Sequence, residues 1–139
     1  MGVERIAVAS DTSETATRAV AWAAEMARNY GAQLIVIQAF VPGPPPAGAE
    51  TDLAVYAEEL CGPGTLARVV AGEDPADAIV AAAKAEKADV LVVGNIGMSG
   101  RREFLLGNVP NRVSHNARCT VVIVNTAEEP KKKRLWSRS

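Results

Sequence analysis

Residues 90–94 read Val-Leu-Val-Val-Gly, and this short stretch decides the fold class. Four consecutive aliphatic residues, most of them β-branched, are typical of a central parallel strand that is covered on both faces. The glycine begins a glycine-rich segment that runs to Asn108, and a helical pattern follows from about Val109 to Ala117. A buried strand, a glycine-rich turn and a helix in succession indicate a βα unit.

Short apolar runs alternate with helical patterns on both sides of this unit. The expected strands are residues 6–9, 34–39, 66–71, 90–93 and 120–124, and the expected helices are 12–30, 50–60, one that opens at 74–75, and 109–117. This order predicts an α/β fold with a single open, doubly wound parallel sheet of five strands, in the order 3-2-1-4-5, and four helices. Such sheets bind ligands beyond the carboxyl ends of the strands where the order reverses, here between strands 6–9 and 90–93.

The helix boundaries carry local signals. Gly31 directly follows the pattern 12–30, at the place where a left-handed residue commonly ends a helix. Asp74 in the N-cap position and Pro75 at the first helical position open the third helix. Residues 41–48 read Val-Pro-Gly-Pro-Pro-Pro-Ala-Gly, which predicts a loop because prolines lack the N–H group that a helix interior or a central strand needs.

The composition is that of one globular domain. The chain has 139 residues, of which 48% are hydrophobic and 4% aromatic, and this length suffices for one core but not for two. The longest apolar runs, 19–24 and 78–83, are too short to span a membrane. Cys61 and Cys119 lack the spacing of a metal site or a disulfide framework, so we expect reduced thiols, no metal and a cytoplasmic location.

The net charge of −1 hides an uneven distribution. Residues 1–130 contain all 16 acidic and 10 of the 15 basic residues, a balance of −6, whereas the last nine residues contain the other five basic ones. We therefore expect a domain over residues 1–127 and a basic, disordered tail over residues 128–139. We expect no nucleic-acid partner for either part.

The glycine-rich segment is the first candidate site. Its glycines at positions 94, 97 and 107 let the backbone approach a ligand closely, and the segment leads to a helix N-terminus, which favours anions. Since Pro110 removes one N–H from the first turn, the expected donors are the N–H groups of Gly107, Asn108 and Val109 and the Asn108 side chain. The segment is therefore either a phosphate cradle or a turn with a helix cap in which the glycines are spacers.

Asp11 is the second candidate, because it follows strand 6–9 at the expected carboxyl edge of the sheet. A carboxylate at this place can accept a hydrogen bond from a ribose hydroxyl or an adenine edge, as acidic residues do in other doubly wound folds. The alternative is that Asp11 or Ser13 caps the helix that follows. From the residues alone, both interpretations stay open.

The combination of these features resembles the universal stress protein family over residues 4–126. The resemblance rests on the pattern Gly-x2-Gly-x9-Gly followed by a small polar residue, on the aspartate after the first strand and on the βα order. It implies an adenine-nucleotide site in which adenosine contacts Asp11 and the backbone of Val41, and in which the phosphates contact Gly94, Gly97, Gly107 and Asn108. It also implies ATP or AMP as the ligand, with Mg²⁺ only beside ATP, and a homodimer through the last strand, Thr120–Val124. Residues 94–99 and 105–110 also resemble an actinobacterial branch in which cyclic AMP can be the ligand.

The sequence departs from the family at two places. Position 108 is Asn where ATP-binding members have Ser or Thr, and the proline-rich connection 40–65 is shorter than expected. Asn108 can cap the helix with its oxygen and donate its NH2 to a phosphate, or its larger side chain can fill the cradle.

Three functions remain: a stress or signalling protein whose interactions depend on a bound nucleotide, an enzyme acting on nucleotides, and a ligand-free dimerisation module. The paired histidines and the Ser-Gly-Gly loop of nucleotide-processing relatives are absent, with His115 the only histidine, so we predict no enzyme. The three glycines favour the nucleotide-binding function over the ligand-free module.

Overall fold

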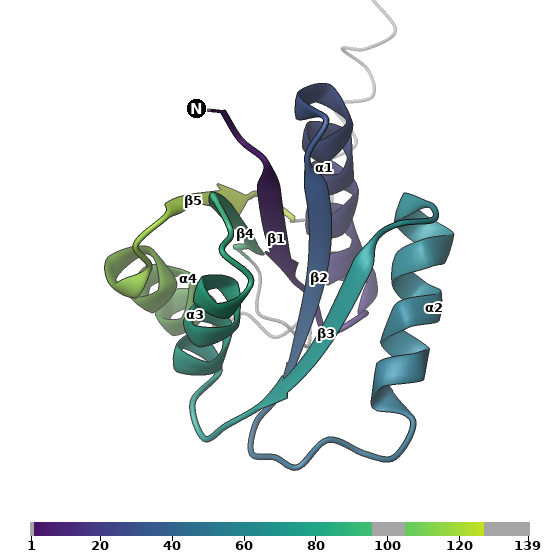
Figure 1. Ribbon diagram of the computed structural model, residues 1–139. Helices are drawn as coiled ribbons and strands as arrows, with labels where there is room; N and C mark the ends of the chain where they lie inside the picture. Colours follow the sequence, from purple (N-terminus) through teal and green to yellow (C-terminus); the bar gives the residue numbers. More distant parts are fainter. Residues whose placement is uncertain (1, 96–104, 127–139) are drawn as a thin grey trace, which may run out of the picture.

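The described part of the chain folds into a sheet covered by helices on both faces. The computed structural model describes residues 2–95 and 105–126 (Figure 1). Five parallel strands lie in the order β3-β2-β1-β4-β5, which confirms the predicted topology. The strands are β1 (Arg5–Ala9), β2 (Gln33–Phe40), β3 (Leu66–Ala71), β4 (Val90–Gly94) and β5 (Thr120–Val124). The helices are α1 (Glu14–Tyr30), α2 (Ala49–Cys61), α3 (Pro75–Ala85) and α4 (Leu105–Asn116).

The helices divide between the two faces of the sheet. Figure 1 shows α1 and α2 on one side of the strands and α3 and α4 on the other. Val92 of β4 packs into the core beneath α1 and α2, whereas Leu91 and Val93 pack into the core beneath α3. All three side chains are fully buried. The continuous aliphatic run of β4 is thus required because both faces of this strand are covered.

One helix start and one helix end agree with their local signals. The Asp74 side chain accepts a hydrogen bond from the N–H of Asp77, and Pro75 occupies the first turn, which confirms the predicted start of α3. Gly31 adopts a left-handed conformation (φ 65°) after α1, as predicted. The prolines of 41–48 lie in a loop, also as predicted. Within the described residues, each helix is too short or too polar to cross a lipid bilayer.

The start of α4 differs from the prediction. The helix begins at Leu105, four residues before the predicted Val109, so that Gly107 lies in the first turn and Pro110 in the second. Pro110 lacks the N–H that a residue at this helical position donates, and Val113, about one turn later, is fully buried. The local glycine and proline signals therefore did not mark the start of this helix.

Candidate functional site

The strand order reverses between β1 and β4, and a predicted site residue lies at the carboxyl end of each strand: Asp11 follows β1, and Gly94 is the last residue of β4. The register pairs Val8 with Val92, so Asp11 and Asn95 lie at the same level, three residues further along their chains. Val41 follows β2, the other neighbour of β1, at the same edge of the sheet. The fold therefore brings Asp11, Val41 and Gly94 to one edge.

The remaining predicted site residues belong to the segment after β4. Gly107, Asn108 and Val109 lie near the start of α4, and Gly97 and the predicted tail 128–139 lie outside the described residues. The N–H groups of the first turn of a helix have no intrahelical acceptor, and in α4 these are the groups up to Gly107. The N–H groups of Asn108 and Val109 come one and two residues after this turn, so Gly107 is the best placed backbone donor of the three.

Asp11 is fixed at the start of α1 without capping it. Its Oδ1 atom accepts a hydrogen bond from the N–H of Ser13 at 2.9 Å, while the Oγ atom of Ser13 accepts the N–H of Ala16 at 3.2 Å. The helix cap is thus Ser13, and no described residue donates a hydrogen bond to the Oδ2 atom of Asp11. This oxygen can accept a hydrogen bond from a ligand.

The backbone between Asp11 and α1 is strained, and the buried side chain of Ser10 stabilises it through a hydrogen bond. Thr12 has φ 68°, a left-handed conformation that β-branched residues rarely adopt. The Oγ atom of Ser10, which is 2% exposed, accepts the N–H of Thr12 at 3.0 Å. Such strain persists only where the surroundings determine the backbone, and it is enriched at ligand sites.

Tyr56 of α2 completes this support, and the sequence analysis missed it. Its hydroxyl lies 2.9 Å from the Oγ atom of Ser10 and 2.9 Å from the Oγ1 atom of Thr17. The contact joins α2 to the β1–α1 turn across 46 positions of sequence. The sequence signal that could have identified Tyr56 is a tyrosine on a helix that buries its apolar face. A half-buried tyrosine hydroxyl needs a hydrogen-bond partner, so such a residue is expected to contact another polar group.

Gly94 has a packing role beside its predicted ligand role. A β-carbon at this position would lie 3.0 Å from the Cγ2 atom of Thr126, which is fully buried. The Oδ1 atom of Asn95 accepts the N–H of Thr126 at 2.9 Å, and Arg18 donates to the carbonyl of Thr126 at 2.6 Å. The chain after β4 is therefore tied to the end of β5 and to α1. Sequence analysis identified none of Asn95, Thr126 and Arg18.

The edge also has an apolar floor. A small cavity of about 40 Å³ lies beside Asp11, and its lining includes Ala9, Ile37, Pro75 and Ile79. The cavity is smaller than a nucleobase, so it forms the floor of a site and not the whole of it. An apolar floor with a carboxylate at its rim suits a planar ring that carries hydroxyl or amine donors. Among residues 2–95 and 105–126, no cluster of three His, Cys, Asp or Glu could hold a metal ion.

The loop 41–48 is attached to the end of β3. The N–H of Gly43 donates to the carbonyl of Gly72 at 3.3 Å, and a β-carbon at position 43 would lie 2.6 Å from the Cβ atom of Ala71. Only glycine allows this close approach to the end of β3. The loop that contains Val41 thus has a fixed attachment at the same edge of the sheet.

Comparison with known proteins identifies one family. The model of the universal stress protein family matches residues 2–125. The universal stress protein Rv1636 of Mycobacterium tuberculosis is 34% identical, over 87% of this chain and 95% of its own length. A universal stress protein solved in complex with cAMP is 34% identical, covers 91% of this chain and 100% of its own, and has a TM-score of 0.73. The universal stress protein from Archaeoglobus fulgidus in complex with dAMP is 25% identical over 90% of this chain and 100% of its own, with a TM-score of 0.66.

Proposed function

The chain belongs to the universal stress protein family, and from this premise we propose that it binds an adenine nucleotide at the carboxyl edge between β1 and β4. The observation that carries the proposal is the placement of Asp11. Its carboxylate stands beside an apolar floor, on a strained turn that Ser10 and Tyr56 hold in place. Gly94 is the last residue of the adjacent strand, β4, where the order of strands reverses.

Each part of the nucleotide has a proposed partner. The carboxylate of Asp11 accepts hydrogen bonds from adenosine, and the backbone of Val41 contacts the base. The phosphates lie against the segment after β4 and the start of α4, whose positive dipole end favours anions. The phosphate contacts are Gly94, Gly97, Gly107, Asn108 and Val109. The early start of α4 supports the N–H of Gly107 as the donor among them, and Asn108 then contributes through its side chain.

ATP or AMP is the proposed ligand, with cyclic AMP as the alternative. The ligands of these two relatives, cAMP and dAMP, both contain an adenine base and a phosphate, which supports an adenine nucleotide as the ligand class. Mg²⁺ would accompany ATP only, bound through the triphosphate oxygens.

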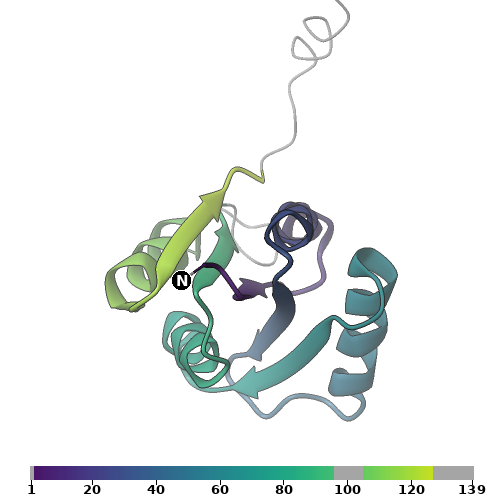
Figure 2. The ribbon, with the colours of Figure 1, turned by 45° about the horizontal axis from the view of Figure 1, so that its top comes forward.

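We propose that the protein is cytoplasmic and that it acts through interactions that depend on its bound nucleotide, not through catalysis. β5 lies at the outer edge of the sheet in Figure 2, and its sequence Thr-Val-Val-Ile-Val has neither charge nor proline. Ile123 of this strand is 45% exposed. An uncharged edge strand is a template for pairing with a second strand. We therefore infer a homodimer through Thr120–Val124 whose contacts respond to the bound nucleotide.

A thermal shift experiment tests the ligand class. ATP with and without Mg²⁺, AMP and cyclic AMP are each added at about a hundred times their Kd, which stabilises the folded state by about 2.7 kcal/mol and raises Tm by several degrees. GTP is the control for the base. If none of the adenine nucleotides shifts Tm, the chain is the ligand-free module. Phosphate release from ATP measured on the same samples checks the non-catalytic part, and sustained turnover would contradict it.

Two variants locate the site. Gly107→Val places a branched side chain at the start of α4 and should abolish the shift, and Asp11→Ala should weaken binding by removing the adenosine acceptor. Glu14→Ala is the matched control, since it removes an exposed carboxylate from the first turn of the same helix. An undiminished shift in the Gly107→Val variant would place the site elsewhere.

A further inference from the structure

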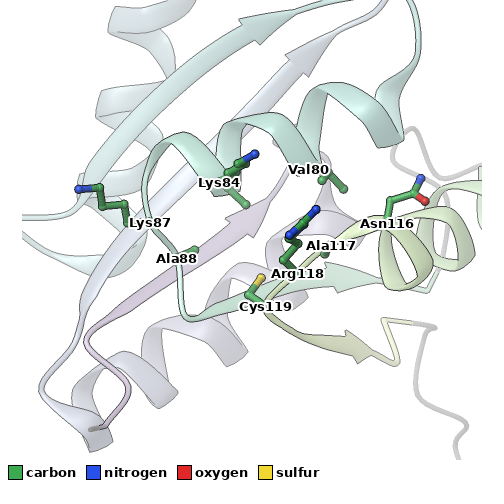
Figure 3. A pocket seen from close by; sticks show the side chains of 9 residues that line it. Val80, Lys84, Lys87, Ala88, Asn116, Ala117, Arg118 and Cys119 are labelled. Carbon is green, nitrogen blue, oxygen red and sulfur yellow. The ribbon is translucent and has the colours of Figure 1, made fainter.

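We propose a second ligand site at the opposite edge of the sheet, which takes a small anion with an apolar body. The site is a hollow of about 370 Å³ between α3 and the segment that joins α4 to β5. Figure 3 shows its side chains, with Lys84 and Val80 coming from α3 and with Arg118 and Cys119 directly preceding β5. A hollow of this volume is within the range of small-molecule sites, about 300–1,000 Å³.

The hollow combines a cationic rim with an apolar floor. Lys84 and Arg118 provide two positive charges at the rim, and Lys87 lines its far end, with a side chain that points away from Arg118 in Figure 3. Val80 and Ala88 provide apolar surface beneath them, together with the thiol of Cys119. A ring or a short alkyl chain can pack on such a floor while a carboxylate, phosphate or sulfonate group meets the rim.

The three cations have no partner in the described part of the chain. Arg68 pairs with Glu86 and Arg112 pairs with Asp74, whereas no described residue forms an ion pair or a side-chain hydrogen bond with Lys84, Lys87 or Arg118. Residues 1–130 carry a balance of −6, since they hold 16 acidic and 10 basic residues. Three unpaired cations at one hollow of an otherwise acidic domain attract anions to that place.

The negative ends of the two nearby helix dipoles neutralise only part of the positive charge at the hollow. α3 ends at Ala85 and α4 ends at Asn116, so the negative dipole ends of both helices lie at this hollow. Each helix C-terminus is equivalent to about half a negative charge, or about −1 for the two. The carboxylate of Asp89, whose charge acts on Cys119, adds one further negative charge, so the three cations leave an excess of about +1, which a monoanion can neutralise.

The hollow is separate from the nucleotide site. Ala88 and Cys119 precede the amino ends of β4 and β5, whereas the proposed nucleotide contacts follow the carboxyl end of β4. β4 has five residues, and a strand of this length spans roughly 16 Å. A ligand that occupies the hollow therefore does not compete with a nucleotide for space.

Protection of a thiol provides a site-specific test. Cys119 lines the hollow and Cys61 lines a different one, beside Arg28 on the other face of the sheet. Burial raises the pKa of both thiols, so both react with maleimide slowly enough for the rates to be measured. The probe is naphthalene-2-carboxylate, and its neutral control is 2-naphthalenemethanol. The rate at each cysteine is followed by peptide mass spectrometry on the full chain.

The carboxylate should slow labelling of Cys119 about elevenfold at ten times its Kd, and it should leave the rate of Cys61 unchanged. The neutral alcohol should protect Cys119 far less. Equal slowing of both thiols, or equal protection by the alcohol, would overturn the proposal. AMP should not displace the probe from Cys119, and displacement would contradict the separation of the two sites.

Charge variants complete the test. In the double variant Lys84→Gln/Arg118→Gln, the Kd of naphthalene-2-carboxylate should rise by about two- to fivefold for each charge removed. Arg28→Gln is the matched control, because it removes one exposed cation beside the other hollow and should not change the Kd. These exposed side chains support no described contact, so the variants should fold, as circular dichroism will show. An unchanged Kd in the double variant would overturn the proposal.

Discussion

Gly94 and Thr126 approach each other so closely that a β-carbon on Gly94 would lie 3.0 Å from the Cγ2 atom of Thr126. Thr126 is fully buried and is held by Asn95 and Arg18, so it has little freedom to move aside. Gly94, the first glycine of the proposed phosphate cradle, thus also packs against Thr126, which lies just beyond β5. This position therefore combines a packing contact with the phosphate contact that we propose.

Gly94→Ala should lower the free energy of unfolding by about 1–3 kcal/mol, because the new methyl group overpacks a fixed contact. Urea denaturation measures this change. Adding Thr126→Ser removes the Cγ2 atom and keeps a hydroxyl for Asn95, so the double variant should recover part of the loss. If it recovers nothing, the contact is not the cause of the destabilisation.

Tyr56→Phe should destabilise the fold by about 1–2 kcal/mol, because the hydroxyls of Ser10 and Thr17 lose their shared partner. The variant should also weaken nucleotide binding, since Ser10 supports the strained backbone that carries Asp11. Urea denaturation and nucleotide titration give the two values. Tyr30→Phe is the matched control, because Tyr30 is 58% exposed, and it should change neither.

Glu86→Gln should lower stability by about 1 kcal/mol. Glu86 lies 3.1 Å from Arg5 and 2.8 Å from Arg68, so its neutralisation leaves two cations facing each other. The expected loss of stability is small because the guanidinium groups of Arg5 and Arg68 are both partly exposed. The difference from the parent should shrink in 1 M salt, which screens such charges. A loss of stability that is independent of salt would indicate packing and not charge.

Acidic pH should destabilise the protein through Asp74 and Asp89. The backbone N–H of Asp77, with the Arg112 guanidinium, lowers the pKa of Asp74, and the N–H groups of Glu4 and Arg5 lower the pKa of Asp89. Because each pKa is lower in the folded state, the unfolded chain takes up protons first as the pH falls. This stabilisation is present above the ordinary carboxyl pKa, near 4, and is lost as the pH falls through the lowered values.

Asp74→Asn isolates one of these groups, since asparagine also caps helices well. Urea denaturation at pH 7 and pH 3 should show a smaller loss of stability in the variant than in the parent. Glu59→Gln, which removes an exposed carboxylate from α2, is the control and should lose as much as the parent. An equal loss in the Asp74→Asn variant would exclude Asp74 as a source of the pH dependence.

The sequence by itself determined the order and type of the elements. The unbroken aliphatic run of β4 and the N-cap at Asp74 are local signals, because strand burial and helix capping involve residues close together along the chain. The strand order followed from the βα alternation, since right-handed crossovers leave few alternatives. The candidate edge, with Asp11 and Gly94, followed from that order.

Only the tertiary structure decided how this edge is built. The contacts of Tyr56 with Ser10 and of Arg18 with Thr126 span 46 and 108 positions, and no local pattern encodes a partner at such a distance. The start of α4 also came from the structure alone, because Gly107 and Pro110 signal a boundary four residues later than the observed start at Leu105. The hollow at the opposite edge is likewise a tertiary feature: it exists because Lys84 and Arg118, 34 positions apart in sequence (118 − 84), line one cavity. Local propensities set the elements, whereas side-chain contacts between distant elements set the sites.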